Sequence, residues 1–197
     1  MWVLWQIRAA VTTTKGPPLE FQTEEQLVES VRRGDTDAFE ELYHRYKRHI
    51  FTFCLKLTGD RSLAEDATHD AFLKMYHNVG TLTNVSVFRS WLFTIARNEV
   101  FKMLRKHHRN GTVDAESVWT DDTPLTFAQT NETKTIVTAC IDSLKVEYRE
   151  VLLLREYEQR TYEEIAAITG STESSVKSRL FKARKALAEK LRPFFES

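Results

Sequence analysis

The side chains best suited to recognition chemistry lie in the segment TYEEIAAITGSTESSVKSRLFKARKAL, residues 161–187. Thr161 and Glu164 form a capping-box pattern before a short apolar run, and Gly170 is suited to end that helix in a left-handed turn. A second helical pattern follows at once, so the segment predicts a helix-turn-helix. Near the start of its second helix, small hydroxyl side chains accompany long cations, a combination that the major groove of DNA can accommodate.

The second helix of this pattern is also basic along its length. Residues 176–192 hold seven Lys or Arg and a single Glu, which is typical of a surface that contacts phosphates. The alternative is a solvated basic helix at the end of a bundle, but here the basic bias coincides with helix-turn-helix spacing. The candidate DNA-binding residues of this segment are Ser171, Thr172, Glu173, Ser174, Ser175, Lys177, Ser178, Arg179 and Lys182.

A second group of cations lies between residues 97 and 109 and follows a run of aromatic residues that begins at Phe88. Cations interleaved with aromatic rings suit a single strand of nucleic acid, because phosphates meet Lys or Arg while bases stack on the rings. Taken alone, most of these aromatic side chains are more typical of a helix core.

An acidic helical face is predicted within AEDATHDAFLKMY, residues 64–76. Asp66 and Asp70 are four positions apart, so both carboxylates point to one side of a helix, near Glu65. A solvated surface explains them equally well. A paired-carboxylate active site does not, because the sequence offers no companion nucleophile, Gly-rich phosphate loop or metal triad. We therefore expect no catalytic residue, no metal site, no cofactor and no small-molecule substrate.

The elements that position these residues are predicted to be helices throughout. Six Gly and four Pro are few for a turn-rich β protein of 197 residues, and strong helix formers are abundant. Hydrophobic periodicity and capping residues predict helices over 24–33, 37–58, 62–77, 88–106, 133–144, 148–157, 162–169 and 171–192, the last ending before Pro193.

The predicted fold is all-α, with two small helical domains joined by a flexible acidic linker. The expected divisions are a disordered N-terminal extension at 1–22, a four-helix domain at 23–109, the linker at 110–133 and a helix-turn-helix domain at 134–194. The 28 Lys and Arg balance the 28 Asp and Glu, yet residues 111–133 carry carboxylates and no cation. The neutral total therefore conceals two mildly positive domains and an acidic linker.

The cysteine pattern and hydropathy bear on the compartment. Cys54 and Cys140 form neither a CxxC pair nor a zinc-ligand spacing, which favours buried thiols in a reducing cytosol. No apolar run reaches the length of a transmembrane helix, and the apolar start of the chain lacks the features of a signal peptide. We expect a cytoplasmic protein.

The chain from about residue 24 to 192 resembles bacterial RNA polymerase sigma factors, and specifically the extracytoplasmic-function (ECF) group of the sigma-70 family. The resemblance is carried in the first half by LVESVRRGDTDAFEELYHRY (27–46), by AEDATHDAFLKMY (64–76) and by FRSWLFTIARNEVFKMLRK (88–106). In the second half it is carried by YREVLLLREYEQRTYEEIAAITGSTESSVKSRLFKARKAL (148–187). Two ordered matches with a linker between them are far more specific than a lone helix-turn-helix.

The resemblance implies a role for each group of residues. Region 2 would dock on the clamp helices of core RNA polymerase through Glu65, Asp66, Asp70, Phe72 and Lys74. It would engage the −10 promoter element through Trp91, Arg97, Asn98, Lys102 and Arg105, with the loop near 80–87 holding an unstacked base. Region 4 would contact the polymerase flap and place the helix-turn-helix residues on the −35 element.

The family also implies a regulatory partner and a physiological setting. Members commonly respond to envelope stress and are held inactive by an anti-sigma factor, often at the inner membrane. The chain departs from the family at Leu144-Lys145, where Leu-Pro is frequent, and at Gln159-Arg160-Thr161, which replaces a frequent Gly-Leu-Ser. The turn Gly170-Ser171-Thr172 also lacks the usual apolar β-branched residue, so the −35 sequence preference stays open.

Two other classes of protein fit less well. A helix-turn-helix repressor or activator would bind a palindrome as a dimer without polymerase, and its N-terminal half would need a ligand pocket for which the sequence shows no signature. A nucleic-acid enzyme would need a nucleophile or metal constellation that the sequence does not contain.

Overall fold

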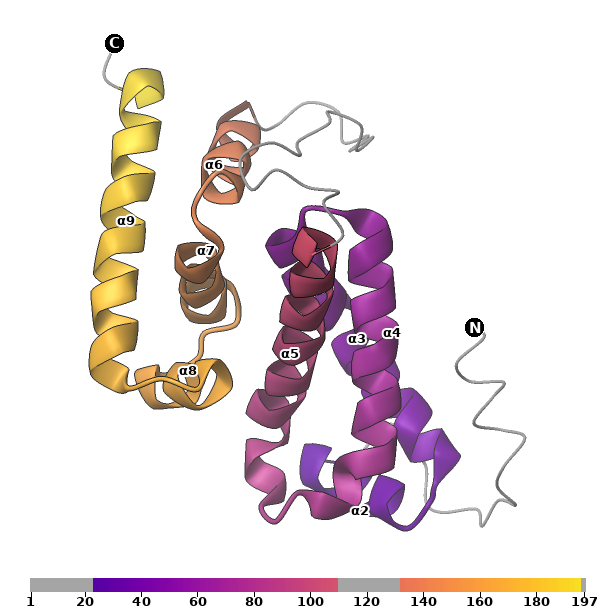
Figure 1. Cartoon of the computed structure of the whole chain (residues 1–197). Coiled ribbons are helices and arrows are strands. Elements are labelled where there is room, and N and C mark those ends of the chain that lie inside the picture. Colours follow the sequence, from indigo (N-terminus) through magenta and orange to yellow (C-terminus); the bar gives the residue numbers. More distant parts are fainter. Residues whose placement is uncertain (1–22, 110–131, 196–197) are drawn as a thin grey trace. The chain divides into compact units, whose positions relative to one another are not determined.

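The computed structural model describes residues 23–109 and 132–195, and the regular elements within these ranges are all helices (Figure 1). The chain forms two compact units, one built mainly from residues 23–103 and the other from residues 132–195. The predicted all-α fold with two helical domains is confirmed. The predicted extension at 1–22 and nearly all of the predicted linker at 110–133 lie outside the described residues.

The first unit contains four α-helices and two short 3₁₀ turns. They are α2 (Glu24–Arg32), α3 (Thr36–Thr58), α4 (Arg61–Asn78), η2 (Val79–Thr81), η3 (Val85–Val87) and α5 (Phe88–Arg109). Thr23 and Gln26 form a reciprocal capping box at the start of α2. Asp60 caps α4 by accepting a hydrogen bond from the Leu63 amide at 2.8 Å.

Aromatic side chains make up much of the core of the first unit. Phe39, Phe72, Phe88 and Phe93 are fully buried. Phe72 packs edge-to-face against Tyr43 with ring centroids 4.7 Å apart, and such pairs add about 0.5–1.5 kcal/mol beyond area burial. The rings thereby bring α3, α4 and α5 into one core.

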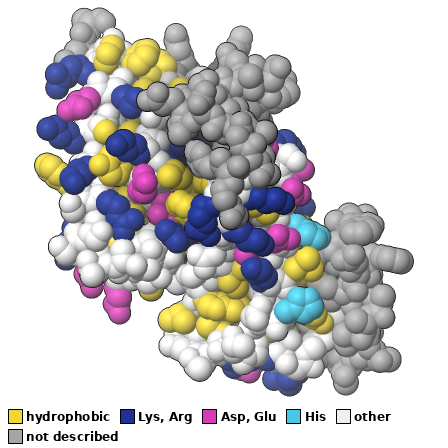
Figure 2. Space-filling model, in the orientation of Figure 1, with side chains coloured by type: hydrophobic (Ala, Val, Ile, Leu, Met, Phe, Trp, Pro, Cys, Tyr) yellow, Lys and Arg dark blue, Asp and Glu magenta, His cyan; other side chains and the backbone are white. Residues whose placement is uncertain are grey.

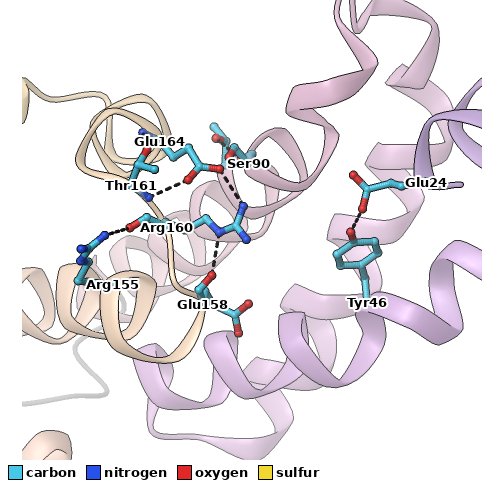
Figure 3. Close-up of polar contacts among 9 residues, drawn as sticks. Glu24, Tyr46, Ser90, Arg155, Glu158, Arg160, Thr161 and Glu164 are labelled. Atoms are coloured by element: carbon cyan, nitrogen blue, oxygen red, sulfur yellow. Dashed lines mark hydrogen bonds and ion pairs between the residues drawn. The ribbon is translucent and has the colours of Figure 1, made fainter.

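Two polar groups of α3 are secured within the same unit. The Tyr46 hydroxyl donates a hydrogen bond to Glu24 and so ties α3 to α2 (Figure 3). Cys54 is fully buried, and burial raises the pKa of its thiol to about 12, although a hydrogen bond with Thr68 acts in the lowering direction. The expectation of a buried thiol at this position is confirmed.

The second unit contains four α-helices and one π-helical turn. They are α6 (Glu132–Asp142), α7 (Val146–Leu152), the π-helix η4 (Leu153–Tyr157), α8 (Tyr162–Thr169) and α9 (Glu173–Phe195). Its core includes Ile141, Leu144, Leu152 and Ala183. On α9 the buried side chains Val176, Leu180 and Ala183 follow the predicted apolar stripe.

Two sequence predictions fail in the second unit. The segment 148–157 was predicted as one helix, but it changes to a π-helix at Leu153, a change that hydrophobic periodicity does not reveal. Helix α9 was predicted to end at Arg192, but it continues through Pro193 to Phe195. A proline in the last turn of a helix removes one backbone hydrogen bond, but few helical residues follow it. The helix geometry can therefore persist to Phe195.

The link between η4 and α8 holds Gln159 in the left-handed region, with φ of 54°. The amide of Glu158 donates to the Leu153 carbonyl at 3.1 Å, and the amide of Arg160 donates to the Leu154 carbonyl at 2.9 Å. Because hydrogen bonds fix both neighbours, Gln159 has no alternative backbone conformation in the fold. Glycine adopts this region without the steric penalty of a Cβ atom.

Replacing Gln159 with glycine should therefore stabilise the second unit. We expect Gln159→Gly to raise the free energy of unfolding by about 1 kcal/mol, because relief of the strained φ exceeds the entropy of a more flexible unfolded chain. Urea denaturation followed by circular dichroism measures the change. Gln159→Ala is the control, since alanine keeps the Cβ atom, and an equal gain in both variants would exclude backbone strain as the cause.

Candidate nucleic-acid and polymerase interfaces

The helix-turn-helix consists of α8, a tight glycine turn and α9. Gly170 has φ of 62° and ψ of 39°, the left-handed conformation expected from the sequence. The Ser171 amide donates to the Ala166 carbonyl at 2.9 Å and closes the turn. Thr172 accepts from the Ser175 amide at 3.2 Å, so the first turn of α9 is capped by a side chain.

One face of α9 is turned away from its buried stripe. Ser174, Ser178, Phe181 and Lys185 recur at helical spacing and are all exposed. Lys182 is exposed beside them. Figure 2 shows the Lys and Arg side chains interspersed with hydrophobic ones over the surface of α9.

Phe181 is a functional candidate that the sequence patterns did not indicate. Its side chain is 70% exposed in the middle of a basic surface. A signal was available in the sequence, because position 181 falls outside the buried series of Val176, Leu180 and Ala183. An exposed ring between cations can contact the methyl group of thymine.

Several other predicted residues of the helix-turn-helix make contacts within the unit. Arg179 is half-buried and its Nε is enclosed without a hydrogen-bond partner. The Lys177 ammonium lies 3.6 Å from a Glu173 carboxylate oxygen and 5.4 Å from the Tyr162 ring centre, so it faces α8. The Ser171 hydroxyl lies 2.7 Å from that of Thr169. Ser174, Ser178 and Lys182 are the predicted residues exposed on or beside the outward face of α9, whereas the exposed Thr172, Glu173 and Lys177 lie nearer the start of the helix.

A polar network fixes the start of α8 (Figure 3). Thr161 donates its amide to Glu164 at 2.7 Å, and Glu164 also accepts from the Arg160 guanidinium at 2.8 Å. Arg155 donates to the Arg160 carbonyl at 2.8 Å and lies 4.9 Å from the Tyr162 ring centre. The π-helix thus supplies a cation that braces the first helix of the motif.

The π-helix also holds α9. The Arg184 guanidinium donates to the Glu156 carboxylate at 2.7 Å, and this hydrogen bond raises the pKa of Arg184 above its ordinary value. Both side chains are about half exposed, so the pair orients α9 while adding little to stability.

In the first unit, α5 presents a second outward stripe. Trp91, Asn98, Lys102 and Arg105 share one side of the helix by its period of 3.6 residues. Trp91 is half-buried and packs against Phe88, whereas the other three side chains are exposed. Arg97 falls off the stripe, since its guanidinium lies 4.5 Å from the Phe101 ring centre on another side of the helix.

The loop before α5 was predicted to hold an unstacked base. It contains η2 and η3, and Asn84 caps η3 by accepting from the Ser86 amide at 3.0 Å. Leu82 anchors the loop in the core, while Thr83, Asn84 and Ser86 are exposed. Val87 at the end of the loop is exposed as well, so the loop offers polar groups for hydrogen bonds and one apolar side chain against which a base can pack.

The acidic face of α4 is only partly as predicted. Glu65 and Asp66 are exposed and Asp70 is half-buried. Phe72 is fully buried in the aromatic core, so its side chain cannot form part of a contact surface and we remove it from the proposed interface.

Lys74 was predicted to contact the polymerase together with the acidic face, but its ammonium is bound by Glu99 of α5. The Glu99 carboxylate is 2% exposed and accepts from Lys74 at 2.5 Å and from Lys102 at 3.1 Å. Burial by itself raises the pKa of Glu99, but the hydrogen bonds and charges of the two lysines outweigh it, so this pKa lies below its ordinary value. Sequence analysis did not single out Glu99.

No group of three His, Cys, Asp or Glu side chains suited to a metal ion occurs within residues 23–109 and 132–195. Nor does any helix of the described part of the chain combine the length and apolar character needed to cross a membrane.

Comparison with known proteins places these surfaces in a family. The model of sigma-70 region 2 matches residues 42–110, and that of sigma-70 region 4 matches residues 134–187. The RNA polymerase sigma-H factor of Pseudomonas aeruginosa is 32% identical over 184 residues, covering 87% of this chain and 95% of that protein. The chain belongs to the sigma-70 family.

A further relative places this sigma factor in the extracytoplasmic-function (ECF) group of the family. The ECF RNA polymerase sigma-E factor of Escherichia coli K12 is 30% identical over 185 residues, covering 87% of this chain and 95% of that protein. The sigma factor RpoE of Bartonella quintana, solved with the anti-sigma factor NepR, aligns with a TM-score of 0.67 and 27% identity, covering 78% of this chain and 96% of that one.

The two family models divide the surfaces of this sigma factor between them. The region 2 match contains the acidic face of α4, the loop at 79–87 and the outward stripe of α5. The region 4 match contains the helix-turn-helix and the π-helix that braces it.

The buried Glu99 of this sigma factor makes its stability depend on pH. Its pKa is lower in the folded chain than in the unfolded chain, where a glutamate titrates near about 4.3. The ionised group therefore stabilises the fold above that pH, and this contribution is lost as the pH falls through the folded pKa. We expect Glu99→Gln to lower the free energy of unfolding by about 1–3 kcal/mol at neutral pH.

The difference between wild type and Glu99→Gln should shrink as the pH is lowered from about 5 to about 3, in urea denaturation followed by circular dichroism. Glu65→Gln is the matched control, because Glu65 is exposed and its ion pair with Arg61 is worth little. A pH profile that is the same for both variants would contradict the special role of Glu99.

Proposed function

We propose that this sigma factor binds core RNA polymerase, recognises both elements of its promoters and directs their melting and the start of transcription. The outward face of α9 is the observation that carries the proposal. Ser174, Ser178 and Phe181 are exposed on a capped helix that follows a tight turn, with Lys182 and Lys185 beside them. Exposed hydroxyl groups, an aromatic ring and cations on one helix face suit DNA binding. Membership of the sigma-70 family indicates that this binding serves transcription initiation.

On the −35 element, some side chains of the outward face of α9 would contact bases and others would contact phosphates. Serine hydroxyls at 174 and 178 can donate to or accept from base edges, and the Phe181 ring can contact a thymine methyl. Lys182 and Lys185 are exposed cations for the flanking phosphates. Phe181 replaces the half-buried Arg179 as the side chain best placed to set the sequence preference.

On the −10 element, the stripe of α5 would receive the separated strand. Trp91 offers a partly exposed ring, Asn98 an amide with donors and an acceptor, and Arg105 a cation. Unpairing a base costs a few kcal/mol, which stacking and phosphate contacts must offset. The exposed part of the loop around Asn84 is our proposed site for the extruded base.

The polymerase contact would be made by the acidic face of α4. Asp66 and Asp70 point to one side of the helix, and Asp66 is exposed. Carboxylates on a rigid helix suit a basic surface on the polymerase clamp, and charge complementarity of this kind sets docking orientation.

We also propose that the chain acts in the cytoplasm under the control of an anti-sigma factor. The support is the relative from Bartonella quintana, which was solved with the anti-sigma factor NepR. As is common in the family, an anti-sigma factor at the inner membrane would hold this chain and release it on envelope stress. Affinity purification from unstressed and stressed cells tests this, and recovery of polymerase alone in both would contradict it.

Run-off transcription with core polymerase tests the function directly. Purified chain and core enzyme should together give discrete products from genomic fragments, whereas either alone gives none. A chain that bound a palindromic site tightly as a dimer without polymerase would instead be an ordinary repressor or activator, and the absence of any promoter-dependent product would overturn the proposal.

Substitutions in the two units should separate promoter binding from polymerase binding. Lys182→Ala should weaken binding of the holoenzyme to promoter DNA and reduce the salt dependence by about one unit of slope, because one phosphate contact is lost. Its affinity for core polymerase should not change. Asp66→Asn should do the opposite, weakening the affinity for core polymerase several-fold while leaving the salt slope of the assembled holoenzyme unchanged.

The two variants serve as controls for each other, and Lys190→Ala supplies a matched cation two turns further along α9. Fluorescence anisotropy of labelled promoter at several salt concentrations reports DNA binding, and titration of labelled chain with core enzyme reports assembly. Equal loss of promoter binding in Lys182→Ala and Lys190→Ala would show that α9 contributes only diffuse charge. Unchanged assembly with Asp66→Asn would refute the acidic face as the polymerase contact.

A further inference from the structure

Two exposed lysines from different helices meet on one buried carboxylate in the first unit. The Lys74 side chain on α4 is 49% exposed and the Lys102 side chain on α5 is 62% exposed, whereas Glu99 between them is 2% exposed. The two Nζ atoms lie 2.5 and 3.1 Å from different oxygens of the same carboxylate. Both ammonium groups are therefore held close together at the surface by an anchor beneath them.

The charges of this cluster do not cancel. One carboxylate faces two ammonium groups, which leaves an excess of one positive charge. Each ammonium has three donor hydrogens, and the bond to Glu99 uses one of them. The cluster can thus bind a further acceptor that carries negative charge and several oxygen atoms.

We propose that Lys74 and Lys102, positioned by Glu99, form a clamp for one phosphate of the DNA backbone. Lysine is an established phosphate binder that acts as a point charge. Ordering a long lysine side chain costs rotamer entropy, and the bond to the buried carboxylate orders both lysines before DNA binds. Lys102 belongs to the stripe of α5, so the phosphate lies beside the bases that Asn98 would contact.

The proposal rests on the −10 role proposed for α5 and changes the assignment of Lys74. The sequence resemblance assigned Lys74 to the polymerase contact and Lys102 to DNA. The shared carboxylate joins the two lysines into one site, in which Glu99 is a positioning residue and both lysines serve DNA. A carboxylate of the polymerase as the occupant is the competing outcome.

Salt-dependent binding of the holoenzyme to its strongest run-off promoter tests the clamp. Lys74→Ala and Lys102→Ala should each weaken binding several-fold and reduce the salt slope. The double variant should lose about one unit of slope in total, because a single phosphate is shared; lysines on separate phosphates would lose about two. Lys47→Ala is the control, since Lys47 is an exposed lysine on α3.

Neutral methylphosphonate linkages placed one at a time along the −10 segment locate the phosphate. One position should weaken binding of wild type but have no effect on the double variant. Glu99→Gln keeps both lysines but frees them, so the same position should lose most of its effect. Circular dichroism identifies any variant that fails to fold, and Lys74→Gln then replaces Lys74→Ala.

Three results would overturn the clamp. The first is a loss of affinity for core polymerase in Lys74→Ala with no change in the salt slope, which would place Lys74 in the polymerase contact. Both lysine variants could match Lys47→Ala while Lys182→Ala still weakens promoter binding, in which case the clamp fails and the proposed function stands. If wild-type holoenzyme binds no promoter at all, the clamp and the proposed function fail together.

Discussion

The arrangement of every candidate surface depends on the burial of one apolar side of each long helix. On α9, burial of Val176, Leu180 and Ala183 leaves Ser178 and Phe181 no position except the solvent side. Burying such a side chain is worth about 1.5–3 kcal/mol, far more than any surface contact the helix makes. Hydrophobic packing thus decides which side chains are offered to DNA, and the polar braces at Arg155 and Glu156 only refine the helix orientation.

Most of the helical framework could be predicted from the sequence, because local rules specify it. Capping at Thr23 and Thr161 and the positive φ at Gly170 depend on residues within a few positions of each other. The change to a π-helix at Leu153 could not be predicted in this way, since it depends on packing and on the hydrogen bond from Glu158. Helix α9 continues through Pro193, so a proline in the last turn did not mark the end of the helix.

The candidate sites were predictable only in part, because side-chain type does not reveal exposure. Phe72 and Phe181 are both phenylalanines beside charged residues, yet one is fully buried and the other is 70% exposed. The role of Glu99 depends on Lys74, which is distant in sequence and approaches only when α4 packs against α5. A contact between helices of this kind has no local signature, so sequence patterns identify neither the anchor nor the shared site.

The burial of Cys54 bears on how this protein can respond to oxidants. Because burial raises the pKa of the Cys54 thiol to about 12, this group stays protonated at neutral pH and the reactive thiolate is scarce. Cys140, the other cysteine of the chain, is also buried. Peroxides and disulfide-forming oxidants attack accessible thiolates, so burial protects both cysteines of the folded protein from them. A response to such oxidants through its cysteines would therefore require local unfolding or a separate sensor protein.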